Sequence, residues 1–267
     1  MKSAIIISLL VASLGLRGAE DWSGSRSLMV SFRGQFSYGP ADGFLQTPAG
    51  GEPGSSSHRR PTFEELDIDD APFYGVLASV EWRSLSVYAG YQAIQLEGQA
   101  VLSQSLISRD VTFPAGTRVE SESDLNWLRV GVGWKAFLLD RRLEFLPKAE
   151  FAVLDFRYEL SDGGQAVERS YPKGCVRLGL ESRYRCSRVV SVSLNAEGSV
   201  PISNTPQIAV LTGGLVFDLL PGSRRVRPTL FLGGGAQRIE YEDNQELPNH
   251  FRVDLGPFVT TGVAISF

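Results

Sequence analysis

Apolar and polar residues alternate along most of this chain, in segments of about ten residues. The first segment is 28–38, where Leu28, Val30, Phe32 and Phe36 fall on one face. Alternation with a period of two indicates a β-strand whose two faces meet different surroundings, and about ten tilted residues suffice to cross a bilayer. Further segments follow at 73–82, 85–96, 119–137, 143–160, 173–185, 189–200, 207–219, 228–241 and 251–267.

The connections between these segments alternate in length. The connections 39–72 and 97–118 are long, whereas 83–84 and 138–142 are short, and the alternation continues towards the C-terminus. Long outer loops and short inner turns are typical of transmembrane barrels. The pattern therefore predicts an all-β fold: a closed antiparallel up-and-down transmembrane β-barrel of about ten strands. Eight or twelve strands stay open as alternatives, because 207–219 alternates poorly.

Charge follows the same division between short and long connections. The predicted inner turns carry arginine, whereas the predicted outer loops are rich in Asp and Glu. We therefore expect Arg83 and Arg141 on the same rim, beside phospholipid headgroups. The inner arginines are Arg83, Arg141, Arg142, Arg185, Arg188, Arg224 and Arg225, and the acidic residues include Glu64, Glu65, Asp67, Asp69, Asp70, Glu120, Glu122 and Asp124.

Aromatic residues gather near the ends of the predicted strands. Amphipathic rings favour the boundary between lipid and water, so two girdles are expected. The predicted inner girdle holds Trp82, Trp134, Phe137, Tyr184, Phe217 and Phe267, and the outer girdle holds Tyr38, Phe73, Tyr74, Tyr91, Phe156, Tyr158, Tyr171, Tyr241 and Phe251.

The N-terminus has the pattern of a secretory signal peptide. Lys2 precedes an apolar run from Ala4 to Leu16, which is too short to span a bilayer as a helix. We expect 1–19 to be the signal peptide, with cleavage between positions 15 and 19. Residues 20–267 then form a single barrel domain that includes the long outer loop 39–72.

The C-terminal strand carries a more specific signal. It ends on Phe267, with Ile265, Val263 and Val259 at alternate positions before it. This segment resembles the closing strand of small Gram-negative outer-membrane barrels of the OmpA and OmpW type. The resemblance implies a location in the cell outer membrane, and recognition of Val263, Ile265 and Phe267 by the barrel-assembly machinery. It also implies outer-membrane lipids and lipopolysaccharide as partners.

Composition excludes several other classes of protein. The formal net charge of -4 gives no electrostatic basis for binding nucleic acid, and 43% hydrophobic residues argue against disorder. The mean hydropathy of -0.04 is far below that of a helical membrane protein, because a barrel hides its lipid face in alternation. Cys175 and Cys186 lie too far apart along one strand for a disulfide, so we interpret both as small packing residues.

No catalytic or cofactor-binding constellation is recognisable in the sequence. The two histidines are His58 and His250, and neither has the partners that a nucleophilic triad requires. The acidic run at 67–70 lacks the glycine and the distal glutamate of a calcium-binding loop, so neither a metal nor a cofactor is expected. Thr62 and Glu65 fit a capping box, which predicts a one-turn helix over the mouth of the barrel.

The strand faces opposite the apolar positions carry charges of both signs. Unpaired charges in a narrow lumen would be costly, so we expect them to pair and to plug the barrel. Arg129, Arg177 and Arg252 should each reach an inward acid, and a slip in the alternation predicts a bulge near Leu154 and Asp155. The predicted inward set is Arg33, Glu81, Arg129, Lys135, Lys148, Glu150, Arg177, Glu181, Arg183, Glu197, Asp218, Arg238, Glu240, Arg252 and Asp254.

These features favour a non-enzymatic outer-membrane barrel with an ion-paired, plugged lumen, whose exterior loops serve in binding, adhesion or envelope integrity. The alternative is a narrow porin-like channel for small solutes, which requires a continuous water path past the internal charges. A hydrolase in the lumen or at the rim is disfavoured by the missing triads. The sequence indicates no particular extracellular ligand.

The terminal residue gives a first testable prediction. Deleting Phe267, or changing it to a charged residue, should reduce insertion into the outer membrane while export proceeds normally, because the alternating apolar terminus is the expected assembly signal. Surface labelling of whole cells, with the periplasmic fraction as the control for export, measures both steps. Unchanged surface levels would mean that Phe267 is only the last residue of a lipid-facing strand.

Overall fold

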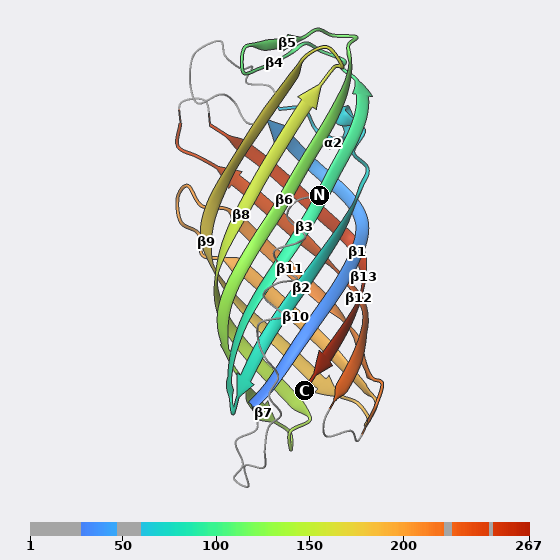
Figure 1. The fold of residues 1–267 in the computed structure, drawn as a ribbon, viewed down its shortest axis with the longest axis vertical. Coiled ribbons are helices and arrows are strands. Elements are labelled where there is room, and N and C mark those ends of the chain that lie inside the picture. Colours follow the sequence, from blue (N-terminus) through green and yellow to red (C-terminus); the bar gives the residue numbers. More distant parts are fainter. Residues whose placement is uncertain (1–27, 47–59, 222–225, 246–247) are drawn as a thin grey trace.

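The computed structural model describes residues 28–46, 60–221, 226–245 and 248–267, which form a closed antiparallel β-barrel (Figure 1). Each wall strand pairs with the next along the chain, and β13 pairs with β1 to close the sheet. The predicted fold and its ten strands are confirmed. The wall strands are β1 (Leu28–Gln46), β2 (Asp70–Trp82), β3 (Leu85–Val101), β6 (Arg118–Trp134), β8 (Leu143–Ser161), β9 (Ala166–Arg185), β10 (Val190–Ser199), β11 (Gln207–Asp218), β12 (Arg227–Glu242) and β13 (His250–Ser266).

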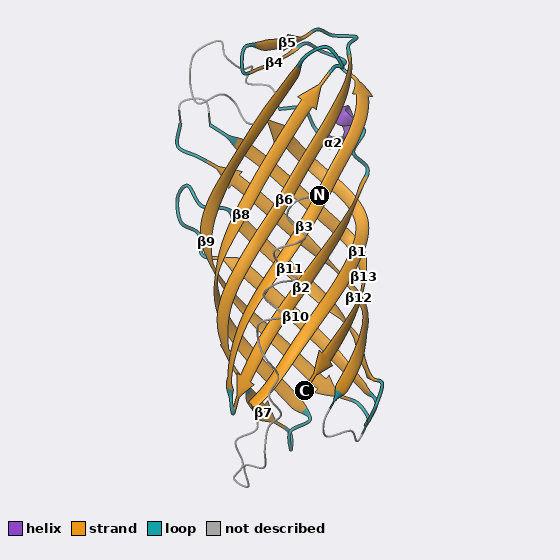
Figure 2. Cartoon of the chain, viewed as in Figure 1, coloured by secondary structure: helices purple, strands orange, loops and turns teal. Residues whose placement is uncertain are grey.

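Shorter elements lie at the two ends of the barrel (Figure 2). β7 (Ala136–Leu138) continues β6 at the inner end, where the short turns carry Arg83 and Arg141 on one rim as predicted. The hairpin of β4 (Leu106–Ser108) and β5 (Val111–Phe113) stands at the outer end, above β3, β6, β8 and β9. No helix within the described residues is long and apolar enough to cross a membrane.

The first outer connection is shorter than the predicted loop 39–72. β1 continues past Tyr38 to Gln46, and β2 begins at Asp70, so paired strands replace both ends of that loop. Between them lies α2 (Phe63–Leu66), the predicted one-turn helix. Its capping box is formed: the Glu65 amide donates to Thr62 Oγ1 at 3.2 Å, and the Thr62 amide donates to Glu65 Oε2 at 3.0 Å. The predicted signal peptide, His58, Arg224 and Arg225 lie outside the described residues.

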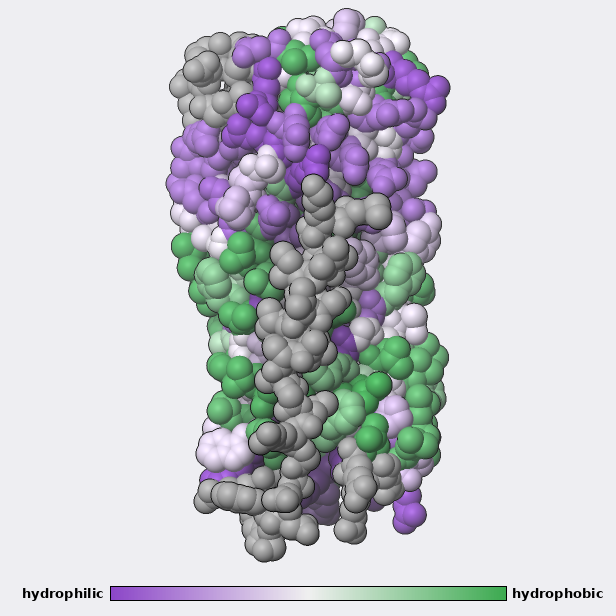
Figure 3. Space-filling view, viewed as in Figure 1, coloured by the Kyte–Doolittle hydropathy of each residue, from purple (hydrophilic) through white to green (hydrophobic). Residues whose placement is uncertain are grey.

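Near the inner end, the wall has an apolar exterior and a polar interior. On β6, Leu128, Val130, Val132 and Trp134 face outward and are exposed, while Arg129 lies between them on the lumenal face. The same outward apolar series occurs on β1, β2, β3, β8, β9, β10, β11 and β13. Together these side chains form a belt around the lower half of the barrel (Figure 3). Tilted strand segments of about nine to eleven residues match the thickness of a bilayer core.

Towards the outer end, this polarity is reversed. In the N-terminal part of β6, which lies at the outer end, the outward positions hold Glu120, Glu122 and Asp124, while Leu125 and Trp127 are buried inside. β3 and β8 show the same exchange, and the upper exterior is hydrophilic (Figure 3). The outer half thus has the pattern of a water-soluble barrel, with its apolar side chains inside. Each long strand therefore leaves the lipid part-way along its length.

The reversal explains two errors of the sequence analysis. The predicted bulge at Leu154 and Asp155 is absent, because the register of β8 with both neighbouring strands is continuous there. The apolar residues of β8 change faces because the surroundings of the wall change. The predicted outer girdle is also wrong for six aromatic residues, which pack inside the barrel: Phe73, Phe156, Tyr158, Tyr171, Tyr241 and Phe251.

A bulge does occur in β13. Between Leu255 and Val259 this strand has one residue more than β1 and β12, the strands on either side of it. The extra residue exchanges the two faces of the strand. As a result, Val253 and Leu255 are buried inside the barrel, whereas Val259 and Val263 face outward.

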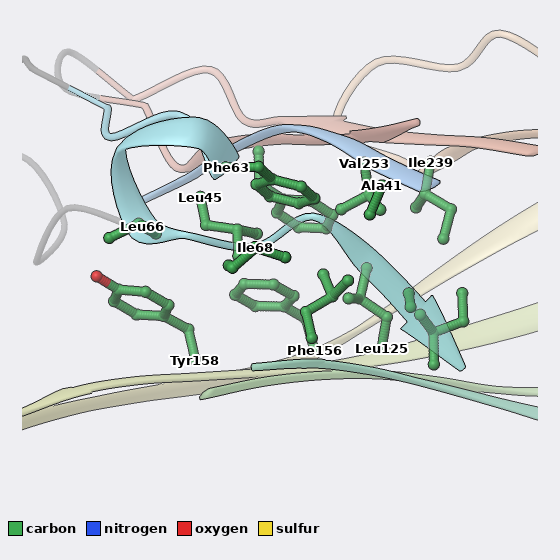
Figure 4. Packing of buried hydrophobic residues seen from close by; sticks show 14 of the residues in the cluster. Ala41, Leu45, Phe63, Leu66, Ile68, Leu125, Phe156, Tyr158, Ile239 and Val253 are labelled. Carbon is green, nitrogen blue, oxygen red and sulfur yellow. The ribbon is translucent and has the colours of Figure 1, made fainter. Parts of the chain in front are cut away.

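The buried apolar residues form one cluster that fills the outer half of the barrel (Figure 4). The α2 segment contributes Phe63, Leu66 and Ile68, which are each at most 1% exposed and pack towards wall residues such as Phe156. Gly98 permits this approach, since a Cβ atom at that position would lie 2.2 Å from the Leu66 carbonyl oxygen. Burial of each such large side chain stabilises the fold by about 1.5–3 kcal/mol. The mouth of the barrel is therefore closed from within.

The boundary between the two halves is testable on β6. Val130→Arg should destabilise the folded barrel by about 2–4 kcal/mol, because it places a charge inside the lipid belt. Asp124→Arg, on the same face but nearer the outer end, should be close to neutral because that position is in water. Urea unfolding in phospholipid vesicles measures both. Equal costs would mean that the belt does not end between these positions.

Candidate functional site

A cluster of buried ion pairs crosses the lumen below the apolar core. The Arg177 guanidinium is fully buried and pairs with Glu150 and with Glu197, whose Oε2 lies 3.0 Å from Arg177 Nη2. Arg129 Nη1 lies 3.1 Å from the same Glu197 oxygen, and Lys148 Nζ lies 2.6 Å from Glu197 Oε1. The cations come from β6, β8 and β9, and Glu197 comes from β10. Glu197 is therefore the centre of this cluster.

Neutral groups and a second carboxylate extend the cluster. The Tyr88 hydroxyl donates to Glu150 Oε2 at 3.0 Å, and Lys148 Nζ donates to Asn195 Oδ1 at 2.8 Å. Lys148 Nζ also lies 3.6 Å from Glu181 Oε2. Both carboxylate oxygens of Glu150 and of Glu197 therefore accept a hydrogen bond, which lowers the cost of taking these two charges out of water. Arg129 Nε and Arg177 Nε are buried without a hydrogen-bond partner among the described residues.

A second tier of ion pairs lies closer to the inner rim. Lys135 Nζ bridges two carboxylates, at 2.6 Å from Glu81 Oε2 and 3.2 Å from Glu144 Oε1. Arg33 Nη2 lies 3.7 Å from Glu181 Oε1, and its side chain is 46% exposed. Water therefore reaches the lower lumen but not Arg177, whose side chain is 0% exposed.

The charges in the two tiers balance. One unpaired buried charge costs several kcal/mol, whereas a paired and hydrogen-bonded one costs far less. The set is consequently stable only as a whole, and it holds strands from different parts of the wall together. It is not a ring of one sign, which is the usual arrangement in charge-selective pores. The cations are Arg33, Arg129, Lys135, Lys148 and Arg177, and the anions are Glu81, Glu144, Glu150, Glu181 and Glu197.

The apolar core lies directly on this ionic layer. The Trp127 ring centroid is 5.8 Å from Arg177 Cζ, and both side chains are almost completely buried. At the same boundary the Gln92 side-chain amide donates to Gln237 Oε1 at 3.1 Å, which joins β3 to β12 inside the barrel. The lumen is thus filled by two successive layers, one ionic and one apolar.

Most of the predicted inward charges lie in the lumen. The residues that form salt bridges there are Arg33, Glu81, Arg129, Lys135, Lys148, Glu150, Arg177, Glu181 and Glu197. Arg183 and Asp218 share the inward strand parity but form no salt bridge with a described residue. Sequence reasoning missed Glu144, although it has the same parity on β8 as Lys148 and Glu150.

The prediction was wrong for four charged residues, which lie on the exterior: Arg238, Glu240, Arg252 and Asp254. On β13 the cause is the bulge, and on β12 it is the reversal of polarity. Arg252 Nε does reach an acid, Asp254 Oδ2 at 3.0 Å, but on the outer surface. Arg238 shares this carboxylate, which raises the pKa of Arg238 through its hydrogen bond and its charge. Arg129 and Arg177 each form a salt bridge with an inward acid, as predicted.

The remaining candidate residues are placed as follows. His250 Nε2 lies 3.3 Å from Glu240 Oε1 at the outer rim. Across the described ranges, no group of three or more His, Cys, Asp or Glu side chains is positioned to hold a metal ion. Cys175 is buried inside the barrel, whereas Cys186 is exposed in an inner turn, so the packing interpretation is wrong for Cys186. Val263, Ile265 and Phe267 face outward at the inner end of the closing strand.

Comparison with protein-family models gives no match, and neither does comparison with curated proteins. Solved structures do match. The attachment invasion locus protein Ail of Yersinia pestis, in complex with the heparin analogue sucrose octasulfate, has a TM-score of 0.36 and 9% identity, covering 88% of this chain and 99% of Ail. Neisserial surface protein A has a TM-score of 0.36 and 10% identity, covering 91% and 100%. The P. putida toluene transporter TodX has a TM-score of 0.30 and 10% identity, covering 89% of each chain.

These TM-scores lie below 0.5, so the assignment to a membrane depends on the closed sheet and on its apolar belt. A belt of exposed apolar side chains around a sheet without edges is compatible only with lipid. The protein is an outer-membrane β-barrel. Its lumen, filled by ion pairs and by the apolar core, is the candidate site from which its role can be argued.

The central glutamate gives the sharpest test of the ionic layer. Glu197→Gln should destabilise the barrel by about 3–5 kcal/mol, because it leaves three buried cations without their shared carboxylate. Glu181→Gln is the matched control and should cost less, since its side chain is 23% exposed against 5% for Glu197. Unfolding in vesicles measures the difference. Equal, small costs would show that the ionic layer is hydrated.

Proposed function

We propose that this protein is a non-conducting, non-enzymatic barrel. Its rigid wall holds the polar outer half and the outer loops above the lipid, where they serve in binding, adhesion or envelope integrity. The observation that carries the proposal is the doubly filled lumen. A channel needs a continuous water path, and here such a path would have to cross both the ionic and the apolar layer. Opening either layer alone would leave the other in place.

The outer half supports the second part of the proposal. Its wall continues beyond the lipid belt as a hydrophilic barrel whose interior is apolar, so it stays rigid without lipid around it. Strands β3, β6, β8 and β9 rise highest and carry the β4–β5 hairpin at their tip (Figure 1). The exposed face of these strands is acidic: Glu97, Glu120, Glu122 and Asp124 lie at outward positions, and Arg157 pairs with two further outward acids, Glu159 and Glu168. Such a surface favours partners of positive charge.

The two cysteines allow the sealed lumen to be tested directly. Cys175 is 2% exposed and faces the interior at the level where the two layers meet, with the Ser199 hydroxyl at 3.6 Å from its Sγ. In the folded protein a water-soluble maleimide should label Cys186 readily and leave Cys175 unlabelled. After unfolding, both should react. Mass spectrometry of the labelled protein counts the adducts.

Cys186→Ser leaves Cys175 as the single thiol and is the matched variant for this test. Its folded form should stay unlabelled on the timescale on which the wild type reacts once. In parallel, planar-bilayer recording of the wild type should show no steady conductance steps. Labelling of Cys175 in the folded variant, or ohmic steps in the wild type, would contradict the proposal and favour the channel for small solutes.

A further inference from the structure

The inner rim carries a surface of exposed arginines with few acids beside them. We call it the inner-rim arginine surface: Arg83, Arg141, Arg142, Arg185, Arg188 and Arg227, all exposed. None of these guanidinium groups forms a salt bridge with a described carboxylate, in contrast to the arginines of the lumen. The guanidinium groups of this surface are therefore free to pair with an anion from outside the protein.

Two turns bring four of these arginines together. The Arg185 amide donates to the Arg142 carbonyl oxygen at 2.8 Å, so the turn that contains Arg141 adjoins the turn that contains Arg188. Asp140 is the single acidic side chain in these two turns. Like charges on adjacent strand ends destabilise the pairing. An anion bound between the turns would remove that repulsion.

Two of these arginines occupy strained turn positions and contact aromatic rings. Arg83 has φ 58 and Arg141 has φ 66, in the left-handed region that asparagine and glycine adopt most easily. Each guanidinium lies over an aromatic ring of the inner girdle: Arg83 Cζ is 5.0 Å from the Trp82 ring centroid, and Arg141 Cζ is 5.7 Å from that of Phe137. Cation–π contacts therefore hold the charges at the edge of the lipid belt.

We propose that the inner-rim arginine surface binds the phosphate headgroup of an anionic phospholipid in the inner leaflet. A guanidinium can donate two parallel hydrogen bonds to a phosphate, which a lysine cannot do. The position favours a lipid over a soluble anion, because the exposed Trp82 and Phe137 rings adjoin the same arginines and meet the acyl chains. The inference is independent of the role proposed for the outer half.

Native mass spectrometry of the purified full-length protein in detergent tests this proposal, with phosphatidylglycerol and phosphatidylethanolamine as probes. The wild type should retain phosphatidylglycerol at concentrations at which phosphatidylethanolamine is lost. The double variant Arg142→Gln/Arg185→Gln should bind phosphatidylglycerol roughly thirtyfold more weakly, at about 1 kcal/mol for each arginine. Arg142→Lys/Arg185→Lys should recover only part of the affinity, because lysine keeps the charge but not the paired hydrogen bonds. Heat-modifiable gel mobility confirms that each variant is folded.

Arg118→Gln/Arg157→Gln is the matched control, since it removes two exposed arginines from the outer end. It should leave phosphatidylglycerol binding unchanged. Equal retention of the two lipids by the wild type would overturn the proposal. So would an equal loss of phosphatidylglycerol affinity in Arg142→Gln/Arg185→Gln and in Arg118→Gln/Arg157→Gln. Displacement of the lipid by inorganic phosphate at the same concentration would also overturn it, as would tighter binding of anionic peptidoglycan fragments than of phosphatidylglycerol.

Discussion

The structure depends on one constraint: the medium outside the wall changes from lipid to water part-way along continuous strands. An exposed side chain must match its medium, and strand parity then decides what faces inward. Where the exterior is apolar, the inward positions take up the polar residues. Where the exterior is charged, the inward positions hold the apolar core. Both fillings of the lumen follow from this exchange, without any break in the register of β3, β6 or β8.

The ionic layer sits where the surroundings make its charges most costly, inside the wall and level with the lipid. Such a layer is stable because its charges cancel and because Glu197 gathers cations from three other strands. The apolar layer above it excludes water, which strengthens these interactions. The apolar layer in turn rests on Arg177 through Trp127. The two layers are therefore interdependent, and together they make the wall rigid at the level where it leaves the membrane.

Periodicity and loop lengths were sufficient to predict the barrel, its strand number and the shared rim of Arg83 and Arg141. The capping box correctly predicted α2, and parity identified most of the lumenal charges. Parity failed on β12 because it was read as though apolar residues always face lipid, and on β13 because the bulge exchanges the two faces of the strand. The charged outward residues of β6 and β8 held the missing signal: strands of 17 and 19 residues exceed what a bilayer requires. The bulge in β13 did have a local signal that sequence reasoning missed: Gly256 and Pro257 lie at the bulge, and glycine and proline inside a strand mark such irregularities.

The position of the lipid boundary on β6 tests the central claim most directly. Nitroxide labels attached in turn at the outward positions 120, 122, 124, 128, 130 and 132 can be compared for collision with oxygen, which concentrates in lipid, and with a water-soluble nickel chelate. We expect collisions with oxygen to be more frequent at positions 128–132 and collisions with the nickel chelate to be more frequent at positions 120–124, with a single crossover between them. Oxygen-dominated values along the whole series would contradict the account, because the outer half of the wall would then lie in the membrane.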